Sequence, residues 1–151
     1  MIIKNIEKEE LRELISVYQS GYKGIEKYAY TDKKRIYSYL KWLYNKEPEG
    51  FFVAEIDGKK IGFAVIHSNW LDKEIGLTAE LHEICIAKEY QGKGVGTKLF
   101  LQVLQYAKIK KRDKMSLWVG EKNFKARNWY KRLGFKETGK YNEWIRMIKS
   151  I

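Results

Sequence analysis

One stretch of the chain, residues 79–107, constrains the fold more than any other. It reads AELHEICIAKEYQGKGVGTKLFLQVLQYA. An apolar, β-branched run leads into a glycine-rich segment, residues 91–96, after which apolar residues recur at the helical i, i+4 spacing. The pattern predicts a strand, a glycine turn and a helix. Its three glycines allow positive φ, and the amides of such a turn and of the first helical turn point together at an anion, most often a phosphate.

Two well-known glycine loops do not match these residues. A dinucleotide-binding fingerprint needs its third glycine three places after the second, where this chain has Thr97. A P-loop ends in Gly-Lys-Ser or Gly-Lys-Thr, whereas Gly96, Thr97 and Lys98 stand in another order. The pattern that fits is Gln/Arg-x-x-Gly-x-Gly/Ala, beginning at Gln91.

Length and composition indicate one folding unit. We expect residues 1–151 to form a single domain, because this length can bury a sizeable core and no linker or low-complexity segment divides it. The one cysteine, Cys85, cannot form an internal disulfide, which is typical of a reducing compartment. No signal-like segment and no long apolar run occur. We therefore expect a cytoplasmic protein with no membrane partner.

The chain is strongly basic, with 30 Lys and Arg against 19 Asp and Glu and a formal net charge of +11. Such a charge attracts polyanions, and nucleic acid is the obvious candidate. However, the basic residues are spread along the chain, with one local cluster at residues 108–114, and no nucleic-acid-binding motif accompanies them. We expect a lysine-rich surface and a site for an anionic cofactor, and no nucleic-acid partner.

The N-terminal part predicts one strand and two helices. A short strand comes first, Asn5 is the expected cap of the first helix, and Thr31 or Asp32 caps the second, which ends before Pro48. The aromatic segment between the two helices, residues 21–30, is expected to be a loop.

The remaining residues predict six strands and two helices. Residues 51–56 and 60–66 read as a hairpin joined at Asp57 and Gly58, and residues 69–77 as a loop before the strand that starts at Ala79. The later elements are the helix after the glycine turn, a strand at 115–119, a helix from Asn123 to Gly134, and strands at 135–138 and 141–148 with a turn at Gly139-Lys140. The order β-α-α-β-β-β-α-β-α-β-β predicts an α/β fold with a mixed sheet and helices on both faces.

A second motif lies near the C-terminus: Asn123-x-x-Ala126, then Tyr130-x-x-x-Gly134-Phe135. Together with the glycine turn it resembles the GNAT superfamily of N-acetyltransferases, over essentially the whole chain. Within the superfamily the two motifs look most like the branch of spermidine/spermine acetyltransferases and other small-amine enzymes. The resemblance implies a central, mostly antiparallel sheet with a splayed strand.

The resemblance also implies acetyl-CoA as co-substrate and no metal. The pyrophosphate would lie on the turn amides, the pantetheine would pair with the unpaired backbone of the splayed strand, and the N–H of Ile86 would face the thioester oxygen. The implied cofactor-binding residues are Ile84, Cys85, Ile86, Gln91, Gly92, Lys93, Gly94, Val95, Gly96, Thr97, Asn123 and Tyr130.

Acetylation of an amine needs a base, because an alkylammonium is almost fully protonated at neutral pH. Strand alternation places Glu80 and His82 on one face and Glu83 and Cys85 on the other. Glu80 and His82 match positions of family bases, and Glu83 or a water are the alternatives. Tyr130 is the implied acid for the departing thiolate. We expect no nucleophilic role for Cys85, because it would face away from Glu80.

The predicted function is transfer of the acetyl group from acetyl-CoA to a primary amine by direct attack in a ternary complex. The alternative is a regulatory or nucleic-acid-binding module that binds CoA without turnover. The acceptor stays open between a small amine or polyamine and a protein N-terminus or lysine. Residues 22–30 are expected to shape the acceptor groove, and a homodimer through the C-terminal strand also stays open.

Overall fold

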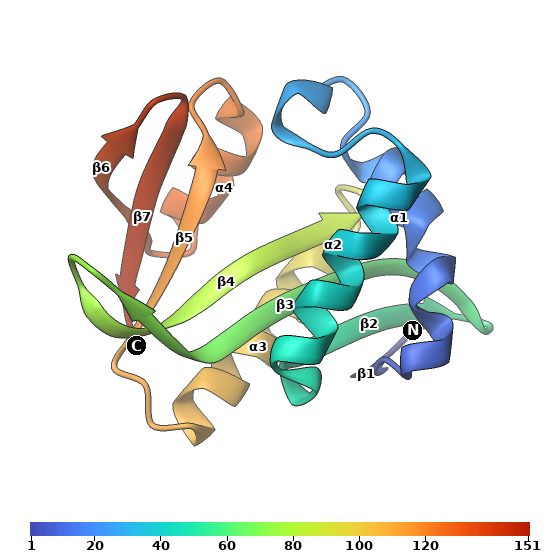
Figure 1. Cartoon of the computed structure of the whole chain (residues 1–151), viewed down its shortest axis with the longest axis horizontal. Coiled ribbons are helices and arrows are strands. Elements are labelled where there is room, and N and C mark those ends of the chain that lie inside the picture. Colours follow the sequence, from blue (N-terminus) through green and yellow to red (C-terminus); the bar gives the residue numbers. More distant parts are fainter.

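The computed structural model describes residues 1–151 and contains one seven-stranded sheet (Figure 1). The strands lie in the order β1-β2-β3-β4-β5-β7-β6. Their bounds are β1 (Ile2–Asn5), β2 (Phe51–Ile56), β3 (Lys59–Asp72), β4 (Gly76–Ile86), β5 (Lys114–Gly120), β6 (Lys136–Tyr141) and β7 (Trp144–Ser150). Neighbouring strands are antiparallel, except that β4 and β5 are parallel. The predicted element order and the mixed sheet are confirmed.

Four α-helices cover the two faces of the sheet. They are α1 (Leu14–Gly21), α2 (Lys33–Lys46), α3 (Val95–Ile109) and α4 (Phe124–Arg132). Alternation along β2 shows the division: Phe51 packs in the core under α1 and α2, whereas Phe52 packs in the core with α3. No helix is both long enough and apolar enough to span a membrane.

The helix N-caps follow the sequence at two of the three predicted places. The carboxylate of Asp32 accepts the amide of Arg35 at 2.8 Å, and the side chain of Asn123 accepts that of Ala126 at 3.4 Å. The predicted cap at Asn5 is wrong. Asn5 ends β1, and Glu7 begins a 3₁₀ helix (Lys8–Glu13) that leads into α1. Since the Glu10 side chain accepts the Glu7 amide, a capping box of two glutamates replaces the expected cap.

Two turns also differ from the prediction. The expected loop at residues 69–77 is mostly strand, because β3 and β4 continue into a hairpin whose turn is built by Asp72 accepting the amides of Glu74 and Ile75. The last hairpin turns at Asn142, with φ +52°, and not at Gly139. The predicted hairpin at Asp57-Gly58 is confirmed, with positive φ at both residues.

Strands β4 and β5 separate soon after they meet. They pair only through Ala79 with Met115 and Glu80 with Ser116, and beyond this point they diverge like the arms of a V (Figure 1). The second half of β4 therefore has β3 on one edge and no strand on the other. This opening positions the candidate site.

A β-bulge in β4 changes which side chains share a face. Val65 of β3 lies opposite Glu83, and the next residue, Ile66, lies opposite Leu81, so His82 is an extra residue. Glu83 therefore points to the same face as His82, the face covered by α1 and α2. The prediction that Glu83 and Cys85 face away from Glu80 and His82 is wrong, because simple alternation ends at the bulge.

Candidate active site

The glycine turn ends in the first turn of α3 and leaves a row of free amides. Gly94 caps the helix with φ +86°, a conformation that other residues adopt only with strain. The first helical hydrogen bond runs from the Lys98 amide to the Gly94 carbonyl at 3.1 Å. None of the backbone N–H groups from Gly92 to Thr97 donates a hydrogen bond within the protein. Six consecutive free amides at a helix start are suited to an anion such as a pyrophosphate.

The splayed strand leaves a second set of free backbone groups. The amide of Ala87 pairs with the carbonyl of Ile61 at 2.9 Å, and antiparallel pairs alternate between bonded and non-bonded positions. Ile84 and Ile86 therefore direct their backbone N–H and C=O groups into the opening, whereas those of Cys85 face β3. Of the three residues expected to present backbone groups to the opening, Ile84 and Ile86 do so and Cys85 does not.

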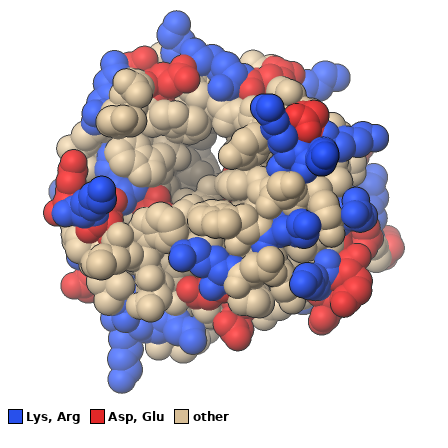
Figure 2. Space-filling model, in the orientation of Figure 1, with Lys and Arg blue, Asp and Glu red and all other residues tan.

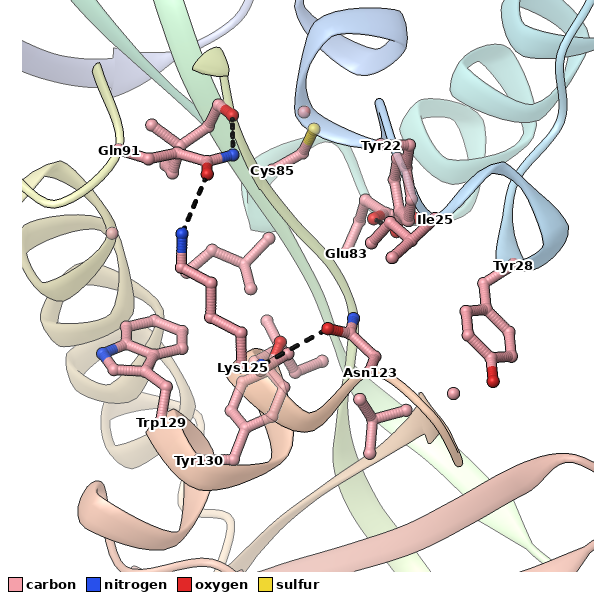
Figure 3. A pocket seen from close by; sticks show the side chains of 18 of the residues that line it. Tyr22, Ile25, Tyr28, Glu83, Cys85, Gln91, Asn123, Lys125, Trp129 and Tyr130 are labelled. Atoms are coloured by element: carbon pink, nitrogen blue, oxygen red, sulfur yellow. Dashed lines mark hydrogen bonds between the residues drawn. The ribbon is translucent and has the colours of Figure 1, made fainter. Parts of the chain in front are cut away.

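Gln91 bridges the wide end of the opening. Its side-chain amide donates to the carbonyl of Ile86 at 2.9 Å, and its side-chain oxygen accepts from Lys125 of α4 at 3.2 Å (Figure 3). Gln91 thus holds the end of β4 and the glycine turn in register with α4.

A cavity of about 430 Å³ fills the opening between β4 and β5. The side chains of Tyr22, Ile25 and Glu83 face those of Trp129 and Tyr130 across it (Figure 3). The predicted cofactor-binding residues that line it are Ile84, Cys85, Ile86, Gln91, Gly92, Gly94, Gly96, Thr97, Asn123 and Tyr130. Lys93 and Val95 do not line it, and Val95 packs in the core under α3.

Basic side chains also line this cavity, and the sequence motifs did not single them out. They are Lys23, Lys88, Lys125 and Arg132. They come from three separate segments, so among the sequence features only the net positive charge of the chain pointed to them. Together with the free amides they make this end of the cavity favourable for phosphate groups. The structure contains no group of three or more His, Cys, Asp or Glu side chains arranged to hold a metal ion.

Glu83 is a buried carboxylate in the middle of the site. The hydroxyl of Tyr39 donates to one of its oxygens at 2.7 Å, and that of Tyr22 donates to the other. Burial raises the pKa of Glu83 to about 7, although both hydrogen bonds favour the charged form and oppose the rise. A carboxylate with this pKa is able to exchange protons at neutral pH.

Tyr130 lies on α4, across the cavity from Glu83 (Figure 3). Its ring packs against Trp129 and Phe135, with centroids 5.3 and 5.7 Å away, and its hydroxyl makes no hydrogen bond within the protein. Burial, and then the negative charge of Glu83, raise the pKa of Tyr130 above its ordinary value. The phenol is therefore protonated at neutral pH and able to donate into the cavity.

Glu80 lies at the vertex of the V, where β4 and β5 last pair. Both of its carboxylate oxygens accept from the Arg146 guanidinium at 2.9 Å, and one also accepts from the Ser116 hydroxyl at 2.6 Å. Arg146 reaches Asp72 at 2.7 Å as well. The carboxylate of Glu80 thus connects β4 to β5 and β7, and its hydrogen-bonding capacity is largely occupied.

His82 packs in an aromatic group. Its ring centroid lies 4.3 Å from His67, 4.6 Å from Trp70 and 5.6 Å from Trp42. Burial and then the neighbouring His67 lower the pKa of His82 to about 3, and its Nε2 has no partner in the protein. His82 is therefore neutral across the ordinary pH range.

Cys85 is buried against α1. Its thiol donates to the carbonyl of Val17 at 3.6 Å, and burial, followed by the negative charge of Glu83, raises its pKa well above the ordinary value. A thiol in this environment is a poor nucleophile. This reason replaces the expected one, since the bulge places Cys85 on the same face as Glu80.

A second cavity, of about 580 Å³, adjoins the first on the side of α1 and α2. The two share lining residues, among them Tyr22, Tyr28, His82 and Glu83. Glu83 thus stands where a molecule held by the glycine turn and a molecule in the second cavity would meet. The aromatic segment at residues 22–30, which is expected from the sequence to shape the acceptor groove, contributes to this second cavity.

The chain is similar to known proteins along nearly its whole length. The profile of the family described as "Acetyltransferase (GNAT) family" matches residues 8–135. An uncharacterized N-acetyltransferase of Methanocaldococcus jannaschii is 40% identical over 150 residues, which are 99% of this chain and 66% of that protein. The crystal structure of a Pyrococcus horikoshii OT3 protein has a TM-score of 0.90 and 41% identity, covering 99% of this chain and 98% of that one. That of a PaiA N-acetyltransferase from Thermoplasma acidophilum in complex with coenzyme A has a TM-score of 0.77 and 25% identity, covering 99% and 98%.

Proposed function

This chain belongs to the acetyltransferase (GNAT) family, and on that premise we propose that it transfers the acetyl group of acetyl-CoA to a primary amine, by direct attack in a ternary complex with Glu83 as the base. One observation carries the proposal. A buried carboxylate with a pKa of about 7 stands at the junction of two cavities, one of which ends in a row of free amides at a helix start.

The first cavity fits the co-substrate. The amides from Gly92 to Thr97 and the basic side chains around them would hold the phosphates, and Ile84 offers its backbone N–H and C=O groups to the amides of the pantetheine arm. Bound there, acetyl-CoA supplies an acetyl thioester as the electrophile. The N–H of Ile86 is directed into the same opening and would donate to the developing oxyanion.

Glu83 removes the proton that keeps the acceptor unreactive. An alkylammonium in the second cavity gives a proton to the carboxylate, and the lone pair of the free amine attacks the carbonyl carbon. Glu80 fits this role less well, because Arg146 and Ser116 occupy its oxygens. His82 fits less well, because a histidine with a pKa of about 3 is a weak base.

Tyr130 completes the proton transfers. As the C–N bond forms and the C–S bond breaks, its hydroxyl gives a proton to the departing sulfur. The second proton of the attacking nitrogen restores the phenol through solvent, and Glu83 releases its proton to solvent. The net products are an amide, the free thiol of CoA and one proton.

The test is a thiol-release assay with acetyl-CoA and a panel of amines, peptides and acidic proteins. We expect release of CoA thiol that depends on an acceptor, with an acetyl group found on the acceptor amine by mass spectrometry. Binding of acetyl-CoA without acceptor-dependent release for any amine class would contradict the proposal and favour a binding module.

A further inference from the structure

The second cavity has walls of an unusual kind. Eight of its 14 lining residues are Tyr or Trp, contributed by α1, α2, the segment between them, β5 and the last hairpin. Figure 2 shows the hollow between the segment after α1 and the C-terminal strands: its walls are mostly uncharged, and Lys and Arg side chains are spread over the surrounding surface. Such walls favour an apolar or aromatic body and present π faces to a cation.

Only one carboxylate in this cavity is available to a cationic acceptor. The charged residues that line it are Lys27, Glu80 and Glu83. The oxygens of Glu80 already accept hydrogen bonds from Arg146 and Ser116, and Lys27 pairs at 3.3 Å with Glu143, which is not among the lining residues. Glu83 therefore receives one ammonium, and a second ammonium on the same molecule would lose hydration and find no second available carboxylate among the lining residues.

Contacts between the segment after α1 and the C-terminal part of the chain cover part of the second cavity. The hydroxyl of Tyr28 accepts from the amide of Lys122 at 2.9 Å, and its ring lies 5.4 Å from that of Trp144. The ring also lies so close to Gly120 that a Cβ at this position would meet it at 2.5 Å. The segment between α1 and α2 is thus fastened to β5 and the last hairpin. A polypeptide acceptor would have to pass these contacts to reach Glu83, whereas a small molecule needs less space to enter the cavity.

We propose that the acceptor is a small primary monoamine with an apolar or aromatic body, and that polyamines and polypeptides are poor acceptors. This inference rests on the proposed function and narrows its substrate. It departs from the resemblance to the spermidine/spermine branch, because the one free carboxylate and the net charge of +11 both disfavour a polycation.

The direct test compares acceptors that differ in one feature. Hexylamine and hexamethylenediamine have the same chain and differ by one ammonium, while phenethylamine and cyclohexylethylamine differ only in the aromaticity of the ring. We expect kcat/KM for hexylamine to exceed that for the diamine by about tenfold or more, after correction for the two reactive ends of the diamine. We likewise expect kcat/KM for phenethylamine to exceed that for cyclohexylethylamine. Equal or better turnover of the diamine, or of an alanine tripeptide, would overturn the inference.

A rim variant gives a sharper form of the same test. Tyr141 lines the cavity and is 69% exposed, so a polar residue can replace it without disturbing the core. Tyr141→Asp adds a second carboxylate, and the matched variant Tyr141→Asn adds the same shape without charge. We expect Tyr141→Asp to raise the diamine-to-monoamine ratio of kcat/KM by about tenfold over Tyr141→Asn. The same ratio in both variants would count against a single available carboxylate as the cause of the selectivity.

Binding separates this inference from the proposed function. Trp118 and Trp144 line the second cavity, so their fluorescence reports an amine bound to the complex with CoA, in which no transfer can occur. Tighter binding of phenethylamine than of spermidine supports the inference even if no acetyl transfer is found. Tighter binding of spermidine overturns it, whether or not transfer occurs.

Discussion

The hydroxyl of Tyr39 donates a 2.7 Å hydrogen bond to the carboxylate of Glu83, 44 residues away in the sequence. This contact joins α2 to the splayed strand β4. It places a phenol donor beside a buried base, and it favours the charged form of that base against the effect of burial.

The first prediction concerns this hydrogen bond. Tyr39→Phe removes a bond that favours the charged carboxylate, so the pKa of Glu83 rises further. Because the base works in its ionised form, the limb of the pH–rate profile that rises near pH 7 should move upward, by on the order of one pH unit. Tyr37→Phe makes the same substitution on the same helix without touching Glu83 and should leave the limb in place. A limb that stays at the wild-type position in Tyr39→Phe would contradict the account.

The second prediction separates Glu80 from Glu83. Glu80→Gln leaves the buried Arg146 guanidinium with Asp72 as its one carboxylate partner, so the free energy of unfolding should fall by about 3–5 kcal/mol. Replacing both Glu80 and Arg146 by Met should cost less than the sum of the two single changes. Denaturant unfolding measures these values. A Glu80→Gln variant that unfolds like the wild type but loses turnover would return the role of base to Glu80.

The third prediction concerns the amide loop. Gly94→Asp brings a negative charge to the start of α3, so the Kd for acetyl-CoA should rise by at least about tenfold relative to Gly94→Asn, which has the same shape without charge. Gly58→Asp is the control for backbone strain, since Gly58 has φ +78° in the turn between β2 and β3 and does not line the cavity. Equal affinities for the Asp and Asn variants, measured by calorimetry, would show that phosphates do not bind here.

The fourth prediction concerns Tyr130. Tyr130→Phe keeps the ring and removes a hydroxyl that makes no hydrogen bond within the protein, so stability should hardly change. The rate of transfer should fall by about 10²-fold. The deficit should shrink with an acyl thioester whose thiol has a lower pKa, because that thiolate needs less protonation. An equal deficit with both donors would leave Tyr130 as a packing residue only.

The sequence predicted the parts of this fold that depend on local patterns. The glycine turn, the stripe of apolar residues on α3 and the caps at Asp32 and Asn123 each follow from a few neighbouring residues. The hairpin at Asp57-Gly58 does so as well. These elements also carry most of the predicted cofactor-binding residues that line the first cavity, so the positions of these residues in the fold followed from local patterns.

The acceptor side depends on contacts that no local pattern reveals. The bulge at His82 depends on how β3 pairs with β4, and it reverses the face of Glu83. Tyr22 and Tyr39 reach Glu83 across 61 and 44 residues. The hydrogen bonds between Arg146 and Glu80 join residues that are 66 positions apart in the sequence. Strand alternation therefore named Glu83 only as an alternative, and only the packed structure shows which carboxylate is available.

The most direct test of the account is the pH dependence of kcat/KM for the wild type and for Glu83→Gln, with an accepted amine. The wild-type rate should rise with pH through about 7, as the carboxylate loses its proton, and then level off. Glu83→Gln should bind acetyl-CoA normally, lose about 10²- to 10⁴-fold in turnover and lack this limb. A Glu83→Gln enzyme that keeps wild-type turnover and the same rise near pH 7 would contradict the assignment of Glu83 as the base.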